Sequence, residues 1–118
     1  MVVANTEDHR TPSGPDLVRM LQHSLEPDLV AYLVPEVDPA ELRGWKFRDR
    51  QTQRAVKHRL QEVLDVFRRL EARDGPALAR NWFLATNPRL RGRAPAEVIR
   101  EGDVSWAKAA AIDYLERD

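Results

Sequence analysis

The sequence predicts an all-α fold, a compact bundle of about seven short helices. Apolar residues recur at spacings of three and four along most of the chain, as on one face of an α-helix, and no stretch shows the alternation typical of a β-strand. Eight prolines and five glycines among the 118 residues divide these helical stretches into short segments. Proline or aspartate stands at most of the expected helix starts, where both residue types are favoured.

Length and composition limit the organisation to one domain or two small subdomains. We divide the chain into a flexible arm at 1–15, a helix-turn-helix-like subdomain at 16–50, and a third part at 51–118 that combines a long central helix with a C-terminal half. The arm lacks apolar periodicity and the apolar segment of a signal peptide. No apolar run approaches the ~18 residues that span a bilayer. The chain also has no cysteine, and we expect a cytoplasmic protein that does not contact a membrane.

The first half of the chain is expected to form three short helices. The first covers about residues 16–23, and the second covers 27–34 and ends before a proline, because the residue before a proline disfavours the α conformation. The third has the clearest start signal. Asp38 is predicted to cap it, Pro39 occupies its first position, and Glu41 follows the cap by three residues, which is the pattern of a capping box.

The longest helix is predicted at about residues 51–73. Its apolar residues form one stripe at offsets of 0, 4, 7, 8, 11 and 14 from Val56, the pattern of an amphipathic helix. This stripe is long for a small chain, so it either organises the core or contacts a second copy in a homodimer. A following helix at 76–84 places Leu78 and Trp82 four residues apart, and we predict that Trp82 packs in the core beside Leu78.

A loop at residues 85–94 separates that helix from two more. A short helix is predicted to open at Pro95, and the last helix follows a cap at Asp103 or Ser105 and ends near Leu115. The loop combines asparagine, proline and glycine with three arginines, a composition that indicates a defined turn on the surface.

The net charge of zero hides an uneven distribution. Residues 1–42 carry two basic and eight acidic side chains, whereas residues 43–59 carry seven basic and one acidic, and residues 60–118 carry ten of each. The basic segment at 43–59 has two interpretations: a solvated helix face that balances the acidic first third, or a patch that contacts phosphates.

The sequence contains no recognisable catalytic or metal-binding motif. The three histidines, His9, His23 and His58, do not have the spacing of metal ligands, and each is expected on the surface. No glycine-rich phosphate loop or nucleophile elbow occurs, and no carboxylate lies within an apolar run that would raise its pKa. We therefore predict a binding protein rather than an enzyme, without metal or cofactor.

Residues 26–45, "EPDLVAYLVPEVDPAELRGW", have the layout of a helix-turn-helix, in which the second helix enters the major groove of DNA. An ordinary helical corner has the same layout. The second helix contains no asparagine, glutamine or serine to read bases, and Glu41 would repel phosphates unless it faces a cytosine amine. Its expected outward positions are Pro39, Ala40, Glu41, Arg43, Gly44 and Lys46. The basic residues that follow could contact phosphates, and the candidate DNA-binding residues are Arg43, Lys46, Arg48, Arg50, Arg54 and Lys57.

The stretch "NWFLATNPRLRGRAPAEVIREGD" closely resembles the toxin-binding domain of the Xre/MbcA/ParS antitoxin family. The residues that carry the resemblance are, in order, Trp82, Asn87, Pro88, Leu90, Gly92, Pro95, Val98 and Ile99. The helix-turn-helix-like part that ends in Trp45 is similar to the Xre-like half of the same proteins. It departs from them in two respects: its second helix has no asparagine, glutamine or serine where family members usually carry polar residues, and Lys46 follows Trp45 where they usually carry a glycine.

The resemblance implies an antitoxin of a bacterial type II toxin-antitoxin system. Such antitoxins neutralise a RES-domain toxin that consumes NAD, and their C-terminal region covers the entrance of the toxin's NAD pocket. The resemblance also implies a homodimer or a higher hetero-oligomer with the toxin, and binding to operator DNA in some members. Two alternatives stay open at this point: a stand-alone helix-turn-helix transcriptional regulator, and a helical interaction protein without either role.

The loop and the last helix are the predicted toxin contact. An asparagine-proline turn, Gly92 and Pro95 restrict the loop, so it could present its arginines to carboxylates or phosphates at little ordering cost. In the alternative interpretation the arginines are merely solvated and Trp106 packs in the core. The candidate toxin-binding residues are Asn87, Pro88, Arg89, Arg91, Gly92, Arg93, Trp106 and Tyr114.

Overall fold

The all-α prediction is confirmed by a computed structural model, which describes residues 12–117. This part of the chain contains seven α-helices, one short 3-10 helix and no β-strand. The elements are α2 (Gly14–Leu25), α3 (Pro27–Leu33), α4 (Pro39–Gly44), α5 (Arg50–Asp74), α6 (Pro76–Leu84), η1 (Pro88–Leu90), α7 (Pro95–Arg100) and α8 (Val104–Glu116).

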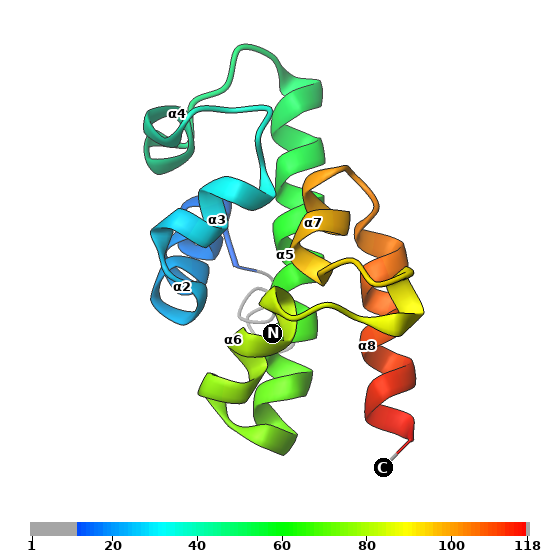
Figure 1. Cartoon of the computed structure of the whole chain (residues 1–118). Helices are drawn as coiled ribbons and strands as arrows, with labels where there is room; N and C mark the ends of the chain where they lie inside the picture. Colours follow the sequence, from blue (N-terminus) through cyan, green and yellow to red (C-terminus); the bar gives the residue numbers. More distant parts are fainter. Residues whose placement is uncertain (1–11, 118) are drawn as a thin grey trace, which may run out of the picture.

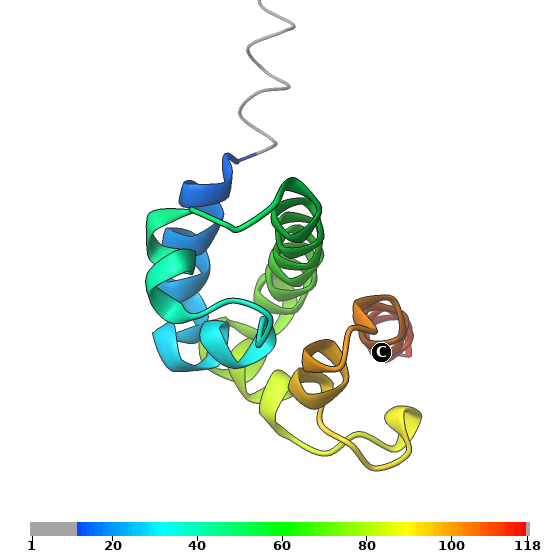
Figure 2. The ribbon, with the colours of Figure 1, turned by 90° about the horizontal axis from the view of Figure 1, so that it is seen from above.

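Helix α5 runs the length of the molecule, and α2, α6 and α8 pack against it (Figure 1). Seen from above, α2, α3 and α4 lie on one side of α5, whereas α7 and α8 lie on another (Figure 2). The predicted apolar stripe of α5 faces these neighbours and is buried from Val56 to Leu70. Core formation therefore accounts for the stripe without a second copy of the chain.

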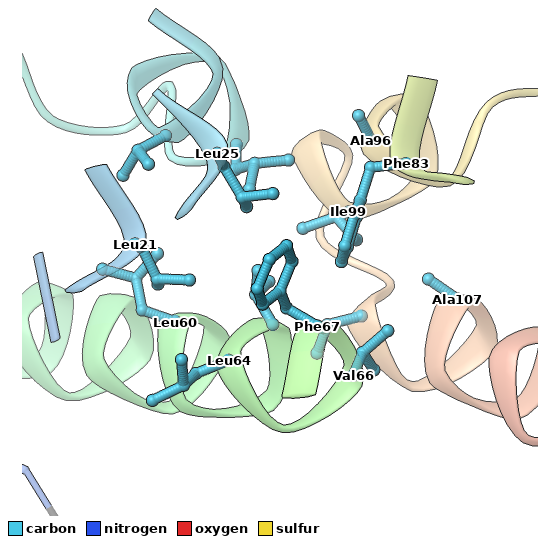
Figure 3. Close-up of a cluster of buried hydrophobic side chains, with 14 of the residues drawn as sticks. Leu21, Leu25, Leu60, Leu64, Val66, Phe67, Phe83, Ala96, Ile99 and Ala107 are labelled. Carbon is cyan, nitrogen blue, oxygen red and sulfur yellow. The ribbon is translucent and has the colours of Figure 1, made fainter. Parts of the chain in front are cut away.

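The two predicted halves share one hydrophobic core. Side chains from α2, α5, α6, α7 and α8 converge in it, as Figure 3 shows. Phe67 of α5 and Phe83 of α6 are its two largest side chains, and both are at most 2% exposed. Because α3 also packs against α7, the helix-turn-helix-like part and the C-terminal part form a continuous structure.

Short-range signals determine most helix starts. Asp38 and Glu41 form the predicted capping box, in which each side chain accepts a hydrogen bond from the backbone N–H of the other, at 2.8 and 3.0 Å. Of the two candidate caps for α8, Asp103 is the one used, and its carboxylate accepts from the N–H of Trp106 at 3.2 Å. The long helix α5 is capped by Asp49.

Two local predictions need correction. Helix α2 begins at Gly14 and is capped by Ser13, so it starts before the predicted Asp16 and includes the end of the proposed arm; residues 1–11 of that arm lie outside the described residues. In α6, Leu78 is 60% exposed and does not belong to the core.

The side of α6 that faces the core is set by its neighbours. The left-handed φ of +88° at Gly75 reverses the chain after α5 and orients α6 so that Ala79 and Phe83 face inward. This second pair has the same spacing of four as Leu78 and Trp82, so periodicity alone could not choose between them. Trp82 is half-buried and packs edge-to-face against Phe83, with ring centroids 5.3 Å apart.

Candidate protein-binding and nucleic-acid-binding surfaces

Asn87 organises the loop between α6 and α7. Its side chain is buried and accepts a hydrogen bond from the N–H of Arg89 at 2.9 Å. Its backbone carbonyl accepts from the N–H groups of Leu90 and Gly92, both at 2.9 Å, and its own N–H donates to the carbonyl of Arg93 at 3.0 Å. At Arg93, six residues further on, the chain has therefore returned beside Asn87, and backbone hydrogen bonds close the loop.

Two consecutive residues of this loop adopt left-handed backbone conformations. Arg91 has a φ of +60° and Gly92 a φ of +81°. Glycine adopts such values without steric cost, whereas arginine does so rarely. Leu90, which is fully buried, anchors the same turn to the core. The loop thus has one defined conformation, as the asparagine, proline and glycine pattern predicts.

The three loop arginines have different surroundings. Arg89 forms an ion pair with Asp113 of α8, and its hydrogen bond holds the pKa of that carboxyl below its ordinary value. Arg93 pairs with Glu101 and lies 3.9 Å from Glu97. In the described part of the chain Arg91 has no carboxylate partner, and its guanidinium lies 5.9 Å from the ring centroid of Trp106. Arg91 is therefore the loop arginine that remains available to a partner.

A shallow hollow of about 240 Å³ lies between η1 and α8. Ala109, Ala110 and Trp106 supply its apolar lining, and the ion pair of Arg89 with Asp113 supplies its charged wall. Trp106 is partly exposed, so its indole is accessible both to Arg91 and to a side chain entering the hollow. Such a hollow suits one apolar side chain of a partner, with a polar group directed towards the charged wall.

Not all predicted toxin-binding residues lie at this hollow. The structure brings Arg89, Arg91 and Trp106 together, whereas Arg93 faces α7. Tyr114 lies beside the C-terminal end of α5, where the guanidinium of Arg73 covers its ring at 4.5 Å. Asp113 belongs to the hollow but was absent from the prediction, because its role depends on a residue 24 positions earlier in the chain.

A second surface lies at the end of the molecule that contains α4 and the first turns of α5 (Figure 1). Arg50, Arg54 and Lys57 recur at intervals of four and three, which places them on one face of α5. Arg48 pairs with Asp49 at 3.5 Å. The remaining predicted DNA-binding residues have no carboxylate partner within the described chain, and we call these five residues the basic end: Arg43, Lys46, Arg50, Arg54 and Lys57.

The seventh basic residue of this segment, Arg59, has a structural position. It is 8% exposed, donates to the carbonyl of Leu33 at 2.8 Å, and forms a two-point ion pair with Glu36. Burial alone raises the pKa of Glu36, but the hydrogen bonds and charge of Arg59 outweigh it, and the net result is a lowered pKa. Arg59 therefore ties the turn between α3 and α4 to α5.

Aromatic packing fixes α4 against α2. Trp45 ends α4 with a left-handed φ of +52°, and its indole lies directly on Gly14 of α2. A Cβ atom at Gly14 would come within 2.0 Å of that ring, so only glycine fits there. The carboxylate of Glu41 is engaged in the capping box, whereas Arg43 is exposed on α4.

Other kinds of site find little support. The residues that the structure describes contain no group of three or more histidines or carboxylates that could hold a metal ion, and none of their helices is long and apolar enough to cross a membrane. His23 and His58 are exposed, whereas His9 lies outside the described range.

The comparisons with known proteins are negative: no family model, curated protein or solved structure matches this chain. The resemblance to the antitoxin family therefore rests on its motif residues alone, and it stays a prediction.

Proposed function

We propose that this protein is an antitoxin that binds an NAD-consuming RES-domain toxin in the bacterial cytoplasm and covers the entrance of its active site. The motif from Trp82 to Ile99 is the basis of the proposal. The observation that supports it best is the state of Arg91, whose guanidinium lies beside Trp106 near the hollow and has no carboxylate partner among residues 12–117.

The proposed contact surface is prearranged. The hydrogen bonds of Asn87 and the buried Leu90 fix the loop before any partner arrives, which reduces the entropy lost on binding. In this proposal Arg91, Trp106 and Pro88 contact the toxin, and the hollow accepts one of its side chains. Asn87, Arg89, Gly92 and Arg93 hold the surface in shape, and Arg91 pairs with a carboxylate near the entrance of the toxin's NAD pocket.

Co-expression tests this proposal. We expect the neighbouring open reading frame, expressed alone, to deplete cellular NAD and stop growth, and this protein to restore both and to co-purify with it. Arg91→Glu should lose most of the protection. Arg68→Glu is the matched control, because Arg68 is an exposed arginine of α5 outside this surface. A harmless neighbour that does not co-purify would contradict the antitoxin proposal.

The basic end favours a second function, binding to DNA. Its five cationic side chains have no carboxylate partners in the described chain, and they surround a helix-turn-helix-like corner that is held rigid by Arg59 and Trp45. Since α4 presents no amide or hydroxyl side chain that could read bases, we expect mostly backbone contacts. In an antitoxin such contacts would serve binding to its own promoter, and in a stand-alone regulator they would be the main activity.

A further inference from the structure

A groove of about 440 Å³ lies on a different part of the molecule from the hollow. Helix α3, the end of α6 and the start of α7 enclose it, and Figure 2 shows these three segments side by side. Its lining is largely apolar, and the carboxylates of Asp28 and Glu97 complete it. The other lining residues are Leu29, Tyr32, Leu84, Ala94 and Ala96. The groove and the hollow have no residue in common, so their occupants can be tested separately.

The groove contains an unusual share of the exposed apolar surface. Three large hydrophobic side chains are exposed in the described residues, and two of them, Tyr32 at 39% and Leu84 at 55%, line the groove. The third, Leu78, lies outside it. Two such side chains in one concave site indicate a binding site more strongly than scattered ones do.

The walls of the groove are held in place from both sides. Arg100 of α7 donates a hydrogen bond to the backbone carbonyl of Tyr32 at 2.9 Å. Its guanidinium also lies 4.5 Å from the centroid of the Tyr32 ring. Val30 and Ile99, on the inner faces of α3 and α7, are at most 1% exposed and belong to the core. The groove is therefore formed before a partner binds.

The charges at the groove indicate what binds there. Asp28 and Glu97, in the first turns of α3 and α7, both line it. Asp28 has no cationic partner in the described chain, and the only ion pair of Glu97 is the 3.9 Å contact with Arg93. An occupant with a lysine or arginine beside an apolar anchor would complement both carboxylates. A second copy related by a two-fold axis would instead bring the same acids together.

We propose that this groove docks a segment of a partner protein in which an aliphatic or aromatic side chain is flanked by lysine or arginine. The apolar side chain enters between Tyr32 and Leu84, and the flanking cations contact Asp28 and Glu97. This site is additional to the toxin surface proposed above.

Selection from a library of random twelve-residue peptides tests the proposal, with the full chain immobilised as bait. We expect the enriched peptides to share an apolar residue next to lysine or arginine. Leu84→Asp should weaken their binding about tenfold or more, because it places a charge in the anchor site. Leu78→Asp is the matched control, since Leu78 is an equally exposed leucine of the same helix, and it should bind the peptides like the wild type.

A charge reversal separates the groove from non-specific attraction. Asp28→Lys combined with Glu97→Lys should reverse the selected preference from basic to acidic flanking residues, while circular dichroism verifies that both variants stay folded. Three results would overturn the proposal: no enriched motif, enriched peptides that bind Leu84→Asp as well as the wild type, or a dimer of the purified chain that Leu84→Asp dissociates. The last result would assign the groove to a second copy.

Discussion

The basic end and the loop around η1 both contain several arginines, but they differ in what surrounds them. In the loop, Arg89 and Arg93 are neutralised by Asp113, Glu97 and Glu101. At the basic end, five cationic side chains lack such partners in the described chain. The loop therefore has little net charge and a fixed shape, whereas the basic end has a concentrated positive charge. This difference suits the loop to shape-dependent protein binding and the basic end to polyanions.

The largest expected effect concerns salt and DNA. If the five residues of the basic end contact phosphates, the affinity for a DNA duplex should fall with a log–log slope of about −4.5, or about 500-fold between 50 and 200 mM salt. Fluorescence anisotropy at several salt concentrations measures the slope. Arg50→Glu with Arg54→Glu should make it shallower by about two, whereas Arg89→Gln with Arg93→Gln should not change it. Equal effects of both pairs would remove the distinction between the two regions.

The second expected effect separates Arg59 from its neighbours in the basic segment. Arg59→Ala leaves the carbonyl of Leu33 without its donor and Glu36 without its partner. We expect the free energy of unfolding to fall by about 2–3 kcal/mol. This loss is smaller than for breaking a fully buried ion pair, because Glu36 is partly exposed and water screens its charge. Arg54→Ala, an exposed position on the same helix, should change it by less than about 0.5 kcal/mol. Urea denaturation measures both, and similar losses would contradict the structural role of Arg59.

The third expected effect concerns the fixed shape of the loop. Gly92→Ala forces alanine into a φ of +81° and should lower the stability by about 1 kcal/mol, although the space around the glycine is open. Gly44→Ala is the matched control, because Gly44 also lies in open space but has no left-handed φ and lies in α4. It should leave the stability unchanged or raise it by about 0.5 kcal/mol. Since an added methyl group meets no other atom at either position, a difference between the two variants in thermal unfolding measures the backbone strain at residue 92.

The smallest expected effect is the response to acid. The pKa of Glu36 lies below its ordinary value of 4.5, so its contribution to stability is complete above that pH and is lost as the pH falls through the lowered pKa. Urea midpoints between pH 6 and pH 3 should therefore decline less steeply for Glu36→Gln than for the wild type. Glu116→Gln, at an exposed position in the last turn of α8, should follow the wild-type curve. Parallel curves for all three proteins would exclude a linkage through Glu36.

The sequence predicts where the helices lie, but it predicts less well which side chains contact one another in the folded protein. The cap at Asp38 and the stripe from Val56 to Leu70 were predicted correctly, and Asp103 was one of two predicted caps for α8, because capping and periodicity act within a few residues. The predicted core face of α6 was wrong. The pair Leu78 and Trp82 and the pair Ala79 and Phe83 are both spaced by four residues, so the spacing could not show which pair faces the core. The groove around Leu84 was not predicted at all, because three helices distant in sequence form it.

The sequence by itself determined the all-α class, the positions of the helices and the turn at Asn87, because short-range capping, periodicity and turn chemistry specify them. The tertiary structure alone decided which charges are neutralised. Arg89 finds Asp113 and Arg59 finds Glu36 across more than twenty residues, whereas Arg91 finds an aromatic ring. The physical reason is that a charge interacts with whatever lies within a few ångströms of it, and that neighbourhood is created only when the helices pack.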